Sequence, residues 1–271
     1  MSEPRSSLVI DSPEDLWRSS TRRSFLRLLG VGGTIALAPT LFAACSGDDN
    51  NPVQPNGGGA QLDLSTDIGI FNYAYALEQL EAAFYSTVVG AANFATLFTD
   101  TNERELLTDI RNHEVVHREF LKAALGSSAI PALALNTTTV AALTADRATI
   151  LKNAQSFEDL GVAAYNGAGK QLKDARNLLV AGKIVSVEAR HAAAIRDARD
   201  TTGRAFAGDD VVIGGLDVKM EPAAVLARVT ALNLVTTPIS VAKQQTDAAT
   251  ADQPAPVASC LTPSLEEHHS S

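Results

Sequence analysis

The sequence predicts an all-α protein whose main domain is a four-helix bundle with one long crossover connection. Three observations predict this fold: the composition, four segments with helical periodicity, and the lengths of the links between them. Aromatic residues make up only 5% of the chain while alanine and leucine are abundant, a composition that favours helices over sheet. With 271 residues, 45% of them hydrophobic, the chain can bury the core of one main domain.

Four segments carry apolar residues at helical spacing, and residues that start or stop helices separate them. The predicted helices span residues 67–89, 102–125, 144–172 and 175–199. The stretch 126–143 breaks the periodicity, and its 18 residues can extend to roughly 60 Å. A helix of 24 residues, such as 102–125, is only about 36 Å long, so this stretch can cross the whole bundle.

The remaining segments are predicted from composition. The bundle is assigned to residues 63–202, and the polar, Gly- and Pro-rich residues 46–62 to a flexible tether. Residues 203–243 fall outside the bundle pattern and form an accessory segment, with an extended or turn stretch at 211–215 and then a short helix. That helix carries Pro222 in its first turn. Residues 244–271 are polar and rich in Pro and Ala, so they are expected to form a disordered tail.

The second and fourth predicted helices each carry a glutamate followed three residues later by a histidine. The pairs are Glu114 with His117 and Glu188 with His191. Residues i and i+3 lie on one helix face about 5 to 6 Å apart, so each pair can offer an oxygen and a nitrogen to one metal ion. A single such pair usually marks a solvated face, and only its repetition gives it weight.

The first and third helices share a second repeated pattern, a glutamate followed seven residues later by a tyrosine. The pairs are Glu78 with Tyr85 and Glu158 with Tyr165. This repeat favours Glu78 over Glu81 as a ligand, because Glu81 would align with Gly161. Glu81 is interpreted as a surface acid or as a partner of a ligand. The two tyrosines are interpreted as orienting ligand carboxylates through their hydroxyl groups, and a redox role remains the alternative.

Together the repeated motifs predict a site for two metal ions. The predicted ligands are Glu78, Glu114, His117, Glu158, Glu188 and His191. One glutamate from each of two helices and one Glu-x-x-His pair from each of the other two is the ligand set of dimetal carboxylate bundles. Four carboxylates offset most of the charge of two divalent ions, and mixed carboxylate and imidazole ligation suits iron or manganese. The sequence does not choose between these two metals.

Other candidate ligands are excluded by their positions. His113 points about 100° away from Glu114 around the helix, and Val187 occupies the matching position in the other half. The two cysteines, Cys45 and Cys260, form no C-x-x-C pair, which disfavours a thiolate zinc site and a disulfide framework.

Residues 72–85 and 184–193 resemble the first and last helices of exported bacterial ferritin-like domain proteins, within the ferritin-like superfamily. The resemblance covers roughly residues 65–200 and implies a bundle with short, long and short links. It also implies that Glu114 and Glu188 bridge the two ions. The other ligands then divide into two pairs, Glu78 with His117 and Glu158 with His191.

The first 45 residues are predicted to be an export signal. The paired Arg22-Arg23, the following Phe-Leu and the uncharged run 28–44 resemble a twin-arginine signal. The run ends in Leu-Phe-Ala-Ala-Cys45, which is similar to a bacterial lipoprotein box. This likeness implies lipidation of Cys45 and attachment to a membrane, in the periplasm or cell envelope. A transmembrane anchor is the alternative, but the run contains glycines and a proline and would span only about 25 Å of a roughly 30 Å hydrocarbon core.

The predicted function is that of an exported oxidoreductase. The formal charge is −9 and no basic stripe with interleaved aromatics occurs, so nucleic acid is not expected as a partner. The resemblance implies that two iron or manganese ions react with O2 or peroxide, with ferroxidase activity or peroxide removal as the result. The alternatives are a non-catalytic metal-binding or stress-associated envelope lipoprotein and a subunit of a larger envelope complex. A homo-oligomer stays open, but a closed storage cage would have to accommodate the anchor, the tether and the C-terminal segment.

Overall fold

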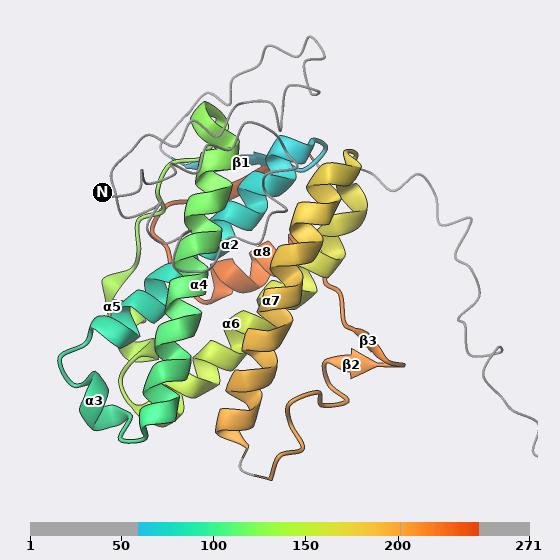
Figure 1. Cartoon of the computed structure of the whole chain (residues 1–271). Helices are drawn as coiled ribbons and strands as arrows, with labels where there is room; N and C mark the ends of the chain where they lie inside the picture. Colours follow the sequence, from blue (N-terminus) through green and yellow to red (C-terminus); the bar gives the residue numbers. More distant parts are fainter. Residues whose placement is uncertain (1–58, 201, 244–271) are drawn as a thin grey trace, which may run out of the picture.

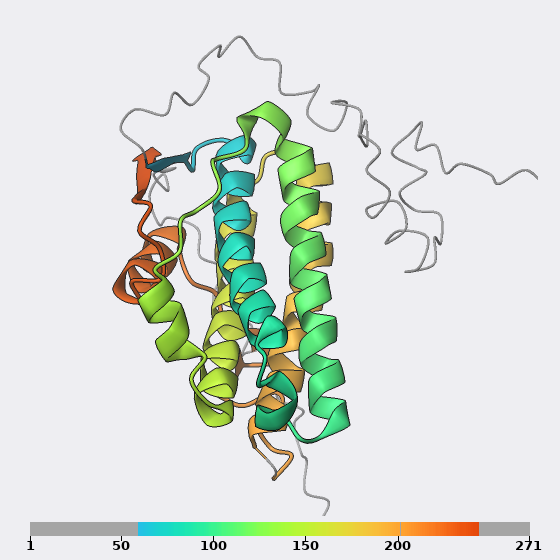
Figure 2. The ribbon, with the colours of Figure 1, turned by 90° about the vertical axis from the view of Figure 1, so that its left-hand side faces the viewer.

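A computed structural model describes residues 59–200 and 202–243 of the chain. These residues form an all-α bundle accompanied by two small two-stranded sheets (Figures 1 and 2). The bundle helices are α2 (Asp67–Gly90), α4 (Thr101–Leu125), α6 (Arg147–Ala168) and α7 (Ala175–Arg199). Helix α2 packs mainly on α4 and α6 mainly on α7. The predicted fold class is confirmed, while the predicted signal, Cys45 and the C-terminal tail lie outside the described residues.

Each bundle helix begins at a side chain that accepts a hydrogen bond from a backbone N–H in the first turn. The capping residues are Thr66, Asp100, Asp146 and Asp174. Such a cap contributes about 1 kcal/mol and fixes where a helix starts. It also corrects the predicted third helix, which begins at Arg147 and not at Thr144. The Asp146 carboxylate caps it by accepting from the Thr149 N–H at 2.8 Å.

The links between the bundle helices contain more structure than the sequence predicted. A short helix, α3 (Phe94–Leu97), lies between α2 and α4, and a 3-10 turn, η4 (Gly126–Ser128), follows α4. The crossover holds a further helix, α5 (Thr137–Leu143), capped by Asn136. The third bundle helix ends at Ala168 and continues only as the 3-10 turn η5 (Gly169–Gln171). The predicted span 144–172 was therefore too long at both ends.

The crossover runs alongside α2 (Figure 2). Two buried amide side chains of α2 hold it there. Asn72 donates from Nδ2 to the Ser128 carbonyl at 2.8 Å and accepts from the Ile130 N–H at 2.7 Å. Two turns later, Gln79 accepts from the Leu133 N–H at 2.8 Å. Because Asn72 and Gln79 lie on one face of α2, these bonds fix the rotation of the helix that carries Glu78.

The two ends of the described chain meet in a parallel strand pair. Strand β1 (Ala60–Asp63) pairs with β4 (Ile239–Lys243). Composition had assigned residues 60–62 to the flexible tether. The strand pairing shows instead that they belong to the folded domain. The partner strand lies almost 180 residues away in sequence, so no local pattern could indicate this pairing.

The accessory segment follows the predicted order of a turn and then a helix. Strands β2 (Val212–Ile213) and β3 (Leu216–Asp217) form a hairpin, and α8 (Pro222–Ala231) begins at the predicted proline. Just before α8, the Met220 N–H donates to the Ala163 carbonyl of α6 at 2.8 Å. A Cβ at Gly167 would lie 1.9 Å from the Met220 carbonyl oxygen, so a glycine is required for this close approach.

Among the described residues, no helix is both long and apolar enough to cross a membrane.

Candidate metal centre

All six predicted ligands lie in the interior of the bundle, where the four helices face one another. Helix α2 supplies Glu78, α4 supplies Glu114 and His117, α6 supplies Glu158, and α7 supplies Glu188 and His191. The four glutamates are 0% exposed, and the two histidines are 9% and 4% exposed respectively. Burying four carboxylates away from water is costly unless cations or hydrogen-bond donors compensate them.

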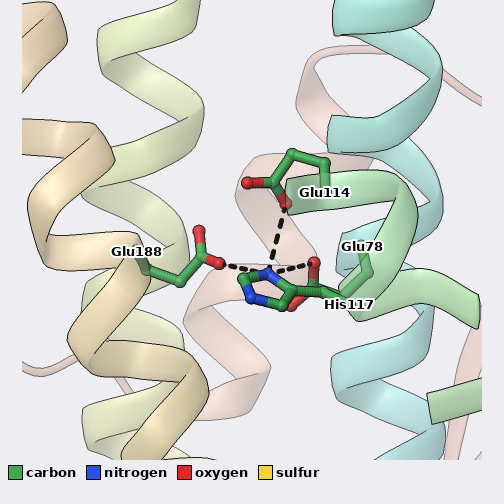
Figure 3. A group of neighbouring side chains, drawn as sticks. All are labelled: Glu78, Glu114, His117 and Glu188. Atoms are coloured by element: carbon green, nitrogen blue, oxygen red, sulfur yellow. Dashed lines mark ion pairs between the residues drawn. The ribbon is translucent and has the colours of Figure 1, made fainter. Parts of the chain in front are cut away.

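The first group of four consists of Glu78, Glu114, His117 and Glu188, and Figure 3 shows their side chains converging from three helices. His117 Nδ1 lies 2.8 Å from Glu188 Oε1, 3.5 Å from Glu78 Oε2 and 3.8 Å from Glu114 Oε2. One atom from each of the four residues lies within 4.8 Å of the others. The nearest oxygen to His117 thus comes from the opposite helix pair and not from its own.

The second group repeats this arrangement with Glu114, Glu158, Glu188 and His191. His191 Nδ1 lies 2.8 Å from Glu114 Oε1, 3.4 Å from Glu158 Oε2 and 3.8 Å from Glu188 Oε2. The three distances agree with those around His117 to within 0.1 Å. The two halves of the site are therefore related by an approximate twofold axis, and Glu114 and Glu188 are the two residues that belong to both groups.

The atoms that face the centre make no aligned hydrogen bonds with one another. They are both carboxylate oxygens of Glu114 and of Glu188, Oε2 of Glu78 and of Glu158, and Nδ1 of His117 and of His191. Their short distances fall in the ion-pair range, and the atoms of each group lie close enough together to share one metal ion. Buried polar atoms without partners are rare in folded proteins, and this donor set of oxygens and imidazole nitrogens fits two divalent ions such as iron or manganese.

The two tyrosines hold the outer carboxylates crosswise. The Tyr85 hydroxyl donates to Glu158 Oε1 at 2.5 Å, and the Tyr165 hydroxyl donates to Glu78 Oε1 at 2.5 Å. Each tyrosine thus bonds the glutamate of the other half, not the one seven residues before it. Burial, followed by the charge of the glutamate it contacts, raises the pKa of each tyrosine well above its usual value. Both hydroxyls therefore remain protonated donors that leave Oε2 of each glutamate facing the centre.

In the metal-free protein, protons provide the compensating charge. Burial raises the pKa of Glu158, and the nearby His191 only partly offsets this effect, so the pKa lies at about 7. Burial lowers the pKa of His191, but the Glu158 charge and the contact with Glu114 outweigh it and raise the pKa to about 12. Burial also raises the pKa of Glu188, but its contacts with His117 and His191 lower it to about 2. Metal ions must displace these protons to bind.

Two further side chains lie beside the six candidate ligands, and neither of them was predicted from the sequence to be a ligand. His113 lies outside both groups of four, but its Nδ1 lies 2.9 Å from Nε2 of His191. Glu81 is only 4% exposed, which excludes the surface position that the sequence left open for it. Burial, and then the charges of Glu188 and Glu114, raise the pKa of Glu81 well above its usual value. Its counterpart Gly161 was the available signal, because a missing side chain in one half leaves room for a larger one from the other.

Comparison with known proteins identifies the family of the bundle. No curated protein matches the chain. A model of the ferritin-like domain family matches residues 66–201, which is half of the chain and includes all four bundle helices. The match begins at the residue that caps α2 and ends just beyond α7. The chain therefore belongs to the ferritin-like domain family.

Proposed function

We propose that this protein holds two iron or manganese ions between its four helices and that it is an oxidoreductase for O2 or peroxide. The observation that supports this most is the convergence of eight buried carboxylate and imidazole atoms that have no aligned hydrogen-bond partner. When bound, two such ions supply two electrons, which with two protons reduce O2 to H2O2 or H2O2 to water. The net result is ferroxidase activity or peroxide removal.

The shared and the unshared glutamates would have different roles in holding the ions. Glu114 and Glu188 each offer an oxygen to both groups of four, so they are suited to bridging two ions. Glu78 and Glu158 each have one oxygen held by a tyrosine and the other facing the centre. A carboxylate fixed at one oxygen keeps its orientation when the charge beside it changes.

We also propose that the domain acts outside the cytoplasm as a lipoprotein attached to a membrane at Cys45. The support is the sequence alone: the paired Arg22-Arg23, the uncharged run 28–44 and the Leu-Phe-Ala-Ala-Cys45 ending. Twin-arginine export carries folded proteins, which suits a protein that acquires metal ions before export.

The proposed function is tested by replacing the two shared carboxylates. Glu114→Ala and Glu188→Ala are expected to lose bound iron or manganese, measured by elemental analysis, and to lose consumption of O2 or peroxide. Glu105→Ala is the matched control, since Glu105 is an exposed acid on the same helix as Glu114. Unchanged metal content and turnover in both site variants would reject the proposal. Two bound ions without any turnover in the unmodified protein would instead support a non-catalytic metal-binding lipoprotein.

A further inference from the structure

The approximate twofold symmetry of the centre is broken beside one of the two histidines. Aligning the two Glu-x-x-His pairs places His113 of α4 opposite Val187 of α7. A valine side chain has no atom that forms hydrogen bonds, whereas an imidazole has two. The two halves therefore differ in what this position can offer to the histidine of the opposite helix.

His191 lies between the centre and His113. Its Nδ1 faces Glu114 at 2.8 Å and Glu158 at 3.4 Å, and its Nε2 lies 2.9 Å from Nδ1 of His113. The two imidazole rings are nearly parallel, with an interplanar angle of 11° and centroids 5.1 Å apart. When Nδ1 of His191 is a ligand, its proton is on Nε2, and His113 Nδ1 is placed to accept that hydrogen bond.

An outer partner of this kind acts on the ligand in two ways. It fixes the ring orientation and the nitrogen that carries the proton, and it raises the basicity of the ligating nitrogen. His117 also turns its Nδ1 to the centre, but the position equivalent to His113 holds Val187 and cannot supply the same bond. The imidazole of His191 is thus better prepared for a metal ion than that of His117.

A second difference between the two halves lies beside Glu188. Glu81 of α2 aligns with Gly161 of α6, and the space beside Gly161 is occupied by the Glu81 carboxyl group. A Cβ on Gly161 would lie 3.0 Å from Glu81 Oε1 and 3.7 Å from Glu188 Oε2. That oxygen of Glu188 is the one that approaches His191. The centre therefore has an additional buried carboxyl group, that of Glu81, which has no counterpart in the other half.

We propose that the two metal positions are inequivalent, and that His113 is the positioning residue that makes the His191 position the tighter one. This inference rests on the proposed dimetal centre. Removing an outer partner of a metal-bound histidine typically lowers metal affinity 10- to 100-fold. The effect is specific to one ion because His113 contacts His191 across the α4–α7 interface and Val187 provides no equivalent contact to His117.

The test is a calorimetric titration of the metal-free protein with Mn²⁺, with stoichiometry checked by elemental analysis. The unmodified protein is expected to bind two ions in two separate steps. His113→Ala should lower the Mn²⁺ affinity of the tighter step about 10- to 100-fold. The affinity of the other step should change by less than about threefold. His113→Asn should restore most of the lost affinity, because its side-chain oxygen can accept the bond from Nε2. Val187→His is the matched variant in the other half and should strengthen the weaker step.

The outcomes separate this inference from the function on which it rests. Fewer than two Mn²⁺ ions bound by the unmodified protein would overturn the dimetal centre and, with it, the assignment of His113. Two ions bound with one shared affinity would overturn only the inequivalence. Equal weakening of both steps in His113→Ala, or no weakening, would likewise overturn the role of His113. The melting temperature of each metal-free variant is measured alongside, and His113→Asn serves as the test variant if His113→Ala does not fold.

Discussion

The Tyr85 hydroxyl on α2 donates a 2.5 Å hydrogen bond to Glu158 on α6, and Tyr165 on α6 makes the equivalent bond to Glu78 on α2. Each bond joins the two halves of the bundle directly at the candidate metal centre. The tyrosines and the glutamates are all buried, so water cannot replace a missing partner. The two halves are therefore coupled through carboxylates that face the candidate metal centre.

Replacing either tyrosine by phenylalanine tests this coupling. Tyr85→Phe leaves Glu158 Oε1 without its donor, and an unsatisfied buried acceptor costs about 1–3 kcal/mol. We expect this loss of unfolding free energy in the metal-free protein, measured by urea denaturation, and a weaker affinity for one ion. Tyr165→Phe should do the same through Glu78. Thr87→Val provides a control, because the exposed Thr87 hydroxyl donates to the Ala83 carbonyl of its own helix and does not join the two halves of the bundle. Site variants as stable as this control would contradict the coupling.

The shared and unshared glutamates are expected to differ in how many ions they affect. Glu188 belongs to both groups of four and Glu78 to one. Glu78→Gln keeps the side-chain volume and the acceptor for Tyr165 but removes a charge. It should therefore weaken the binding of one Mn²⁺ ion and leave the other ion bound. Glu188→Gln should weaken the binding of both ions. Elemental analysis after dialysis distinguishes one retained ion from none, and equal retention in the two variants would show that Glu188 is not a bridge.

The parts of this protein that sequence predicted are those governed by local rules. Helix α7 has the predicted bounds because Asp174 caps its start. The residues of the buried Glu and His groups could be predicted because their spacing in the sequence repeats. The strand pair β1–β4 could not be predicted, since it joins distant segments. The crosswise bonds of the tyrosines and the contact between His113 and His191 depend on how helices face each other, which periodicity does not specify.

Asp67 joins the start of α2 to the turn between α6 and α7. Its carboxylate accepts from the backbone N–H groups of Lys173 and Asp174 and from Nδ2 of Asn177, at 2.8 to 3.0 Å. Asp67→Ala leaves these three donors without their acceptor, so we expect a loss of about 2–4 kcal/mol. The melting temperature should fall by roughly 5–15 °C, while the number of bound ions stays at two. A change below 2 °C would show that water satisfies these donors.

The proposed export and lipidation are separable by two variants. Replacing Arg22 and Arg23 by lysine should retain the full-length protein in the cytoplasm, because the paired arginines are the recognised feature of the signal. Cys45→Ser should still permit export but remove the lipid acceptor, so the protein should move from the membrane fraction to the soluble envelope fraction. Fractionation with immunoblotting measures both. Export of the lysine variant at the normal level would exclude the twin-arginine route, and membrane retention of Cys45→Ser would exclude lipidation at that residue.

The stability of the metal-free protein should fall as the pH rises above about 5. Glu158 has a pKa of about 7 in the folded protein, above its usual value, so its contribution is full below about 4.5 and is lost by about pH 7. His191, with a pKa of about 12, contributes fully below about 6.5 and loses this contribution as the pH rises toward 12. Glu188, with a pKa of about 2, acts in the opposite direction and contributes above about 4.5. The metal-free protein should therefore be most stable at about pH 4.5 to 5.

The stabilisation that metal ions give the protein should grow between pH 5.5 and 8.5. The ions compete with the protons on Glu158 and His191, so raising the pH removes the competitor and strengthens binding. Stabilisation by a ligand grows with its affinity at fixed concentration. The difference in melting temperature between Mn²⁺-loaded and metal-free protein should therefore widen steadily over this range. Glu158→Gln cannot bind or release the proton and should flatten the lower part of the curve. A difference that stays constant with pH in the unmodified protein would show that metal binding does not displace these protons.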